Sequence, residues 1–165
     1  MSEARFTIGV LTLSDKGARG EREDESGRII QEMVAGLGEI RRYEVIPDDE
    51  EGIVARLVAW VDREKLALIL TTGGTGLTPR DLAPQATARV LDYEVPGMAE
   101  AMRSESLKKT PHAMLSRALV GVRRQSLIIN LPGSPKGVRE NLAVVLPALE
   151  HALAKLQGDP SECAR

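Results

Sequence analysis

A short segment rich in glycine and threonine, TTGGTGLTPRD at residues 71–81, has the composition of an anion-binding turn. Gly73, Gly74 and Gly76 permit backbone conformations with φ > 0 and lack the Cβ atoms that would hold a ligand away from the main chain. Successive N–H groups in such a turn form a concavity that binds phosphate, and Thr75 adds a hydroxyl donor. A tight turn between a strand and a helix explains the glycines equally well. The glycines alone therefore leave both interpretations open.

Two carboxylates at predicted strand ends could together hold a divalent cation. Asp81 follows the glycine turn, and a carboxylate there repels phosphate unless a cation lies between them. A surface ion pair between Arg80 and Asp81 is the alternative interpretation of this doublet. Asp48 opens the run PDDEEG, in which most of the acids are explained by the dipole of the helix that follows. Asp48 is the acid closest to the end of the preceding strand. With Asp81 it would suit Mg²⁺, which prefers one or two carboxylates plus substrate phosphates.

A second loop that could bind phosphate is NLPGSPKG, residues 130–137. Asn130 ends an apolar run, Gly133 allows close approach, and Ser134 can cap the final helix while directing its hydroxyl and amide into a cleft. Lys136 would add positive charge. Taken alone, the segment is more typical of a plain N-cap with Pro135 at the first helical position.

The loop after the first apolar run, SDKGARGEREDESG, offers Ser14, Asp24 and Ser26 as ligand contacts. Asp24 or Ser26 is also an ordinary helix cap, and we favour that interpretation over a ligand contact. We interpret His112 and His151 as structural residues on helices, because neither has a partner at metal-ligand spacing. No recognisable Ser-His-Asp arrangement is present.

Short aliphatic runs must position these loops. Residues 6–13, 66–72 and 126–131 lack strict polar alternation, which is typical of strands covered on both faces, and residues 41–46 form a more polar fourth candidate. Helical patterns separate the runs. We therefore predict a single domain over residues 1–165, a three-layer α/β/α fold with a mostly parallel central sheet. Ligands in such folds bind at the carboxyl ends of the strands, where all four loops would gather.

Helical periodicity indicates helices from Asp24 to about Gly36, from Asp49 to about Val61, and over residues 134–156. Pro147 should kink or split the last of these. We also predict that residues 84–120 are helical, with Pro84, Pro96 and Pro111 in first turns.

Composition excludes several classes of protein. With 22 basic and 24 acidic residues the formal charge is −2, and aromatic residues make up 2%, so a nucleic-acid binder is not expected. The single cysteine, Cys163, permits neither an internal disulfide nor a thiol metal cluster. The first residues do not read as a secretion signal and no window has the length of a membrane span. We expect a soluble, cytoplasmic protein.

In combination, the motifs TTGGTG, RD, PGMAEAMRSESLKKTPHAMLSR and LIINLPGSPKG resemble the molybdopterin adenylyltransferase family of molybdenum-cofactor biosynthesis. The Mog-type enzymes and the amino-terminal domain of gephyrin are similar over nearly the whole chain. The glycine loop and RD also occur in MoaB-type proteins, whereas the block from Ser106 to Arg117 favours the Mog type.

The resemblance implies a homotrimer that binds molybdopterin and Mg-ATP, releases pyrophosphate and passes its product to the molybdenum-insertion enzyme in a transient contact. It places the key acids, which would also organise Mg²⁺, at Asp48 and Asp81. It places ligand contacts at Gly73, Gly74, Thr75, Gly76, Ser106, Asn130, Gly133 and Ser134. One departure is Gln85, where the family usually has an acid. Since glutamine is neutral, more of the catalytic and metal-binding role falls to Asp81.

Two alternatives remain open at this point. The domain could bind molybdopterin or a nucleotide without turnover, as a scaffold does, or it could be a MoaB-like protein that differs in oligomeric state and cellular role.

Overall fold

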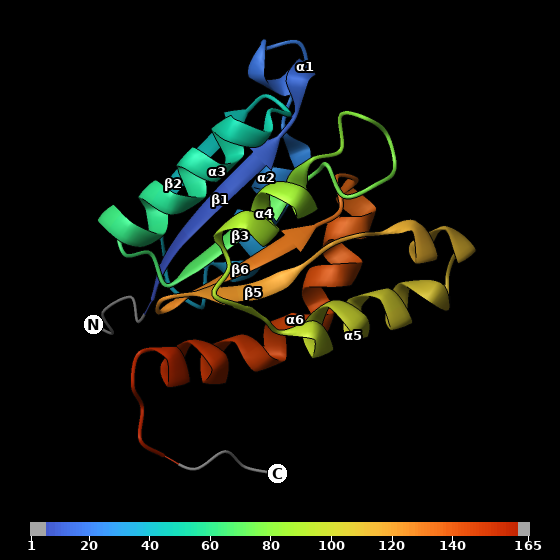
Figure 1. The fold of residues 1–165 in the computed structure, drawn as a ribbon. Helices are drawn as coiled ribbons and strands as arrows, with labels where there is room; N and C mark the ends of the chain where they lie inside the picture. The colour runs from blue at the N-terminus through green and yellow to red at the C-terminus, as the bar shows by residue number, and fades with distance from the viewer. Residues whose placement is uncertain (1–5, 162–165) are drawn as a thin grey trace.

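The computed structural model describes residues 6–161, whose strands form one mostly parallel sheet of six (Figure 1). The strand order is β2-β1-β3-β6-β5-β4. Four strands run parallel: β2 (Glu39–Ile46), β1 (Thr7–Leu13), β3 (Leu68–Thr72) and β6 (Ser126–Leu131). At one edge, β5 (Val120–Arg123) pairs antiparallel with β6, and β4 (Tyr93–Glu94) pairs antiparallel with β5. The predicted α/β fold with a mostly parallel sheet is confirmed.

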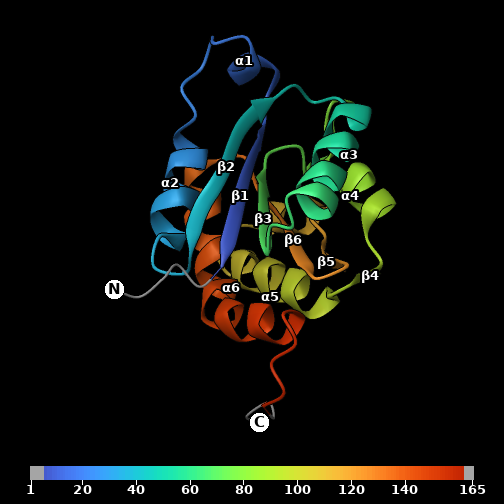
Figure 2. The same ribbon diagram turned by 90° about the vertical axis from the view of Figure 1, so that its left-hand side faces the viewer.

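Helices cover both faces of this sheet, which explains why the central strands are apolar throughout. The helical elements are α1 (Asp15–Ala18), α2 (Glu25–Val34), α3 (Glu50–Val58), the π-helix η1 (Ala59–Arg63), α4 (Ala83–Val90), α5 (Pro96–Leu107), the 3₁₀-helix η2 (Pro111–Leu115) and α6 (Pro135–Leu156). Figure 2 shows α3 and α4 on one side of the sheet and α2, α5 and α6 on the other. Successive residues of a strand face opposite sides, so Leu68 and Leu70 join one apolar core and Ile69 joins the other.

The predicted helical stretch over residues 84–120 is wrong in part. It contains α4, α5 and the short η2, but also β4 and the start of β5. The segment between η2 and β5 is extended and bonds to distant parts of the chain. Arg117 N–H donates to Thr75 O (2.9 Å), and Leu119 N–H donates to Asn130 Oδ1 (3.1 Å). These bonds to distant residues replace the i→i−4 bonds of a helix.

The last helix, α6, runs over 22 residues with Pro147 inside it. Figure 1 shows its axis changing direction along its length, so the helix bends rather than splitting into two elements. Ser134 caps its N-terminus, where the hydroxyl accepts a hydrogen bond from Gly137 N–H (3.0 Å). Within residues 6–161, no helix is both long and apolar enough to cross a lipid bilayer.

Candidate functional site

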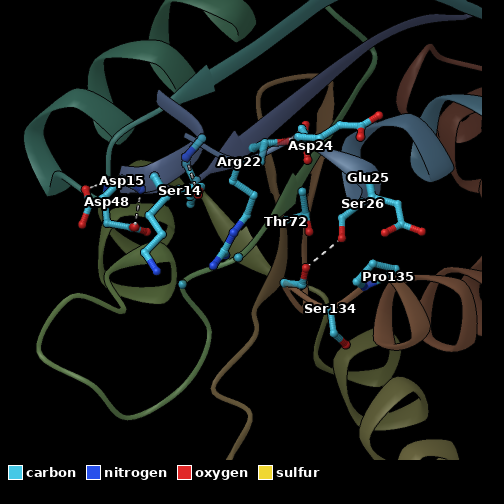
Figure 3. A pocket seen from close by; sticks show the side chains of 18 of the residues that line it. Ser14, Asp15, Arg22, Asp24, Glu25, Ser26, Asp48, Thr72, Ser134 and Pro135 are labelled. Carbon is cyan, nitrogen blue, oxygen red and sulfur yellow. Dashed lines mark hydrogen bonds between the residues drawn. The ribbon is translucent and has the colours of Figure 1, made fainter. Parts of the chain in front are cut away.

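A cavity of about 690 Å³ opens at the carboxyl ends of the parallel strands, where the fold predicts a ligand site (Figure 3). Loops that follow all four parallel strands contribute to its wall. The lining residues include Ser14, Asp15, Arg22, Asp24, Ser26, Asp48, Thr72, Gly73, Gly74, Asp81, Gly133 and Ser134. The structure thus brings together residues that lie up to 120 positions apart, from Ser14 to Ser134, as the parallel topology requires.

Gly73 and Gly74 both adopt positive φ, +98° and +68°. A Cβ at position 73 would lie 2.5 Å from Leu13 O, and Gly73 N–H donates to Leu131 O (3.1 Å), so this glycine is needed for the turn itself. The amides that follow are different. Within residues 6–161, the N–H groups of Gly74, Thr75 and Gly76 donate no hydrogen bond to the protein. The glycine loop therefore combines a structural turn with three amides available to an anion.

Asp48 lies against the first loop through a reciprocal pair of backbone contacts with Asp15. Asp48 N–H donates to Asp15 Oδ1 (3.0 Å), and Asp15 N–H donates to Asp48 Oδ2 (3.2 Å). Burial raises the pKa of Asp48, and the negative charges of Asp15 and Asp81 raise it further. The hydrogen bond from the Asp15 amide and the charge of Arg80 lower it, but the net shift is upward. A carboxylate that is partly buried beside other acids is stabilised by a bound cation.

Asp15 was not singled out from the sequence, and its partner corrects one interpretation. Arg80 does not pair with its neighbour Asp81; its guanidinium donates to both oxygens of Asp15, at 2.8 and 3.1 Å. This ion pair and the Asp48 amide hold the pKa of Asp15 below its usual value. No sequence pattern connects residues 15 and 80, because the fold alone brings them together.

Asp81 keeps one oxygen free in the described part of the chain. Its Oδ2 accepts a hydrogen bond from Thr78 N–H (2.9 Å), while Oδ1 accepts none, and no ion pair involves this side chain among residues 6–161. Oδ1 of Asp48 is equally free of hydrogen bonds in these residues, and it lies 3.5 Å from the position that a Cβ on Gly74 would occupy. The two predicted acids thus line one cavity, each with an oxygen available.

The predicted contacts of the first loop are mainly caps, as the sequence favoured. Ser14 Oγ accepts from Gly17 N–H (3.0 Å) at the start of α1, and Asp24 Oδ1 accepts from Gly27 N–H (3.0 Å) at the start of α2. Ser26 is not a cap; its hydroxyl donates to Gly133 O (2.7 Å) and ties α2 to the 132–134 loop. Figure 3 shows Arg22, which the sequence did not single out, extending from the same loop across the cavity.

A second cavity of about 370 Å³ adjoins the first, with Ser134 on the wall of both. Thr75, Gly76 and Ser106 line it, as do residues of η2 and α6. Ser106 Oγ accepts from Asn141 Nδ2 (3.2 Å). His112 lies on the 3₁₀-helix η2, where it is exposed and lines this cavity.

Asn130 lines neither cavity, contrary to the ligand contact that the resemblance implied. It is fully buried, with 0% exposure. Its Nδ2 donates to the hydroxyls of Thr71 and Thr87, both at 3.0 Å, and its Oδ1 accepts from Leu119 N–H. Every polar atom of the side chain is used to join β3, α4 and the strand-edge segment. Asn130 therefore stabilises the fold by linking these three elements through hydrogen bonds.

The donor set suits a cation shared with a substrate better than a resident metal. Among residues 6–161, no group of three or more His, Cys, Asp or Glu side chains could hold a metal ion. Two carboxylates with free oxygens, Asp48 and Asp81, match the way Mg²⁺ is bound when substrate phosphates supply further ligands.

Comparison with known proteins gives consistent matches. Residues 9–151 match the family described as "Probable molybdopterin binding domain". The chain is 43% identical over 155 residues to a molybdopterin adenylyltransferase of Helicobacter pylori (92% of this chain, 88% of the relative). It is 44% identical over 169 residues to gephyrin of Dictyostelium discoideum, covering 96% of this chain but 23% of gephyrin. Among solved structures, the molybdopterin biosynthesis enzyme MoaB of Thermus thermophilus superposes with a TM-score of 0.88 at 55% identity (95% and 99% covered).

Proposed function

The chain belongs to this family of molybdopterin-binding domains, and on that premise we propose that it adenylylates molybdopterin with Mg-ATP and releases pyrophosphate. The observation that carries the proposal is the larger cavity. There, two carboxylates with free oxygens, Asp48 and Asp81, share the wall with Gly74, whose amide N–H donates no hydrogen bond within residues 6–161. That is a phosphate-binding turn with a place for a divalent cation.

The charges on the two cavity walls support a proposal for where each substrate binds. Among the charged residues that line the larger cavity, acids predominate: Asp15, Glu23, Asp24, Glu25, Asp48 and Asp81, against Lys16 and Arg22. It suits an anion that arrives with its own cation, such as Mg-ATP. The smaller cavity is lined by Arg103, Lys109 and Lys136 with the single acid Glu140, and it suits the phosphate of molybdopterin without a metal. Both substrates would meet at the glycine loop and Ser134.

The carboxylates organise charge and need not accept a proton. The attacking phosphate of molybdopterin has a second pKa of about 6, so at neutral pH it is already largely a dianion. The barrier is the approach of two anions, which makes charge neutralisation and in-line positioning the main contributions of the protein. Bound Mg²⁺ would neutralise charge on the phosphoryl oxygens. Asp48 and Asp81 would hold it, and the loop amides would orient the phosphates.

A second candidate, a MoaB-like protein that binds molybdopterin in the same pathway, is favoured by the solved structure of that name. The two candidates differ in turnover and in assembly. For the transferase we propose a cytoplasmic homotrimer that hands its product to the molybdenum-insertion enzyme. Sedimentation equilibrium would test the assembly, since a monomer or a hexamer would contradict the proposed trimer.

The test of function is pyrophosphate release from Mg-ATP in the presence of molybdopterin, comparing wild type with Asp81→Asn. We expect turnover to fall about 100-fold, with molybdopterin affinity nearly unchanged, because an amide has the shape of a carboxylate but is a poorer metal ligand. Asp92→Asn is a matched control, since Asp92 also accepts a turn N–H, from Arg124 (2.6 Å), away from both cavities. Absence of pyrophosphate from wild type, or an Asp81→Asn variant that loses only molybdopterin affinity, would contradict the proposal.

A further inference from the structure

Arg117 lies between η2 and β5, and its bonds converge on the segment that carries the glycine loop and Asp81. Its backbone N–H donates to Thr75 O (2.9 Å). Its guanidinium makes three more hydrogen bonds: Nε to Gly76 O (2.8 Å), Nη2 to Asp81 O (2.8 Å) and Nη1 to Gln85 Oε1 (3.1 Å). One residue therefore holds four residues of the 75–85 segment, three through its guanidinium and one through its backbone N–H.

These bonds close the loop between Gly76 and Asp81 at its base. The carbonyls of the two residues accept from different nitrogens of one planar group, so their separation is set by the width of the guanidinium. Figure 1 shows this loop standing out from the body of the fold between β3 and α4. Arg117 bonds the backbone of Asp81; among residues 6–161, the only protein hydrogen bond of the Asp81 side chain is the one from Thr78 N–H, which lies within the same loop.

The loop segment so held belongs to both cavities. Asp81 lines the larger cavity, and Thr75 and Gly76 line the smaller one. Arg117 itself lines neither, so it does not reach a substrate in the ligand-free fold. The third hydrogen bond of the Arg117 guanidinium goes to the neutral side chain of Gln85. Within the described chain, Arg117 forms no ion pair with a carboxylate, so its positive charge is not neutralised by one.

Resting on the proposed function, we infer that Arg117 is a positioning residue that sets the distance of Asp81 from Asp48 and so determines how well the pair holds a divalent cation. The residue acts through the backbone of its loop and not by contact with substrate. Mutation of a group that orients a metal ligand without touching the metal itself lowers metal affinity or activity by about 10- to 100-fold. Lysine cannot replace it, because one ammonium cannot span the two carbonyls.

The experiment measures binding of Mn²⁺ in the presence of ATP, by the electron paramagnetic resonance of free Mn²⁺, for wild type, Arg117→Ala and Arg117→Lys. We expect both variants to bind Mn²⁺ about 10- to 100-fold more weakly. Added guanidinium chloride at low concentration should restore part of the affinity of Arg117→Ala by filling the vacated space, and should not affect Arg117→Lys.

Arg123→Ala is the matched control. Arg123 also makes three guanidinium bonds, one to Val90 O (2.9 Å) and two to Asp62 (3.1 and 2.9 Å), away from both cavities. It should lose stability but keep wild-type Mn²⁺ affinity per folded molecule. Equal affinities for Arg117→Ala and wild type at equal folded fraction would overturn the inference, as would an equal loss in Arg123→Ala.

The binding measurement separates this inference from the proposed activity. A wild type that binds Mn²⁺ with ATP but releases no pyrophosphate would contradict the transferase, and the Arg117 comparison would still decide the positioning role. A wild type that binds no Mn²⁺ would overturn the cation pair and the role of Arg117 together.

Discussion

Gly74→Ala, compared with Gly20→Ala, separates the conformational role of a glycine from its role in the site. Both glycines have left-handed φ, +68° at Gly74 and +75° at Gly20. An L-residue in that conformation costs about 1 to 2 kcal/mol. A Cβ on Gly20 would meet nothing within 4 Å, so Gly20→Ala measures the conformational cost alone. Urea unfolding should show similar losses for the two variants, since the new methyl at 74 meets its nearest neighbours in Ala83 at 3.4 Å without severe overlap.

The two variants should differ in ligand binding. The methyl at 74 would lie 3.5 Å from Asp48 Oδ1, the oxygen that we assign to the cation. Loss of one contact to a charged oxygen costs about 1.5 to 3 kcal/mol, which is roughly a 10- to 100-fold loss of affinity. Titration with Mn²⁺ and ATP should therefore show that loss in Gly74→Ala and none in Gly20→Ala. Equal affinities in the two folded variants would refute the reasoning, because the cation could not then lie against that oxygen.

Three further predictions concern the elements around the site. Asn130→Ala should lower the free energy of unfolding by about 3 kcal/mol, measured in urea, because it removes the partner of the half-buried Leu119 N–H and of the buried hydroxyls of Thr71 and Thr87; substrate affinity should be unchanged, and a selective loss of affinity would restore the ligand role. Burial and the hydrogen bond to Asp24 raise the pKa of Tyr43. The stabilising effect of its neutral form is therefore complete below the unfolded-state pKa of about 10 and is lost as pH rises above it; Tyr43→Phe should unfold with a smaller loss of stability at high pH than wild type, and parallel pH profiles would contradict this. Chelation with EDTA should stop pyrophosphate release without lowering the unfolding midpoint of the ligand-free protein, because no described cluster could hold a structural metal; a lower midpoint would reveal one.

The parallel core of the fold could be predicted because its strands are buried on both faces. β3 and β6 are buried at every position, and such strands appear in the sequence as short, continuous aliphatic runs. Once these strands are parallel, their carboxyl ends must share an edge, and Asp48, Asp81 and Ser134 reach one cavity for that reason. The two antiparallel strands, β5 and β4, gave no such signal. β4 has two residues, both exposed, and exists only through its pairing with β5.

The residues that hold the site in place could not be predicted from local pattern. Asp15 and Arg80 are 65 positions apart, and Arg117 acts on a loop 41 residues before it. Such pairs depend on tertiary packing, and an arginine between two apolar segments has no periodicity that marks it as buried. Asn130 shows the opposite case. Its position at a strand end suggested a ligand contact, but its hydrogen bonds are used within the fold.

The central claim is that Asp48, Asp81 and the glycine loop bind Mg-ATP so that its α-phosphorus can be attacked by molybdopterin. The most direct measurement uses ATP labelled at the α-phosphorus with molybdopterin and Mg²⁺, and follows the label. We expect the label to appear in a molybdopterin product together with an equal amount of unlabelled pyrophosphate, and Asp81→Asn to slow both equally. Label that stays in ATP while molybdopterin and the nucleotide both bind would contradict it.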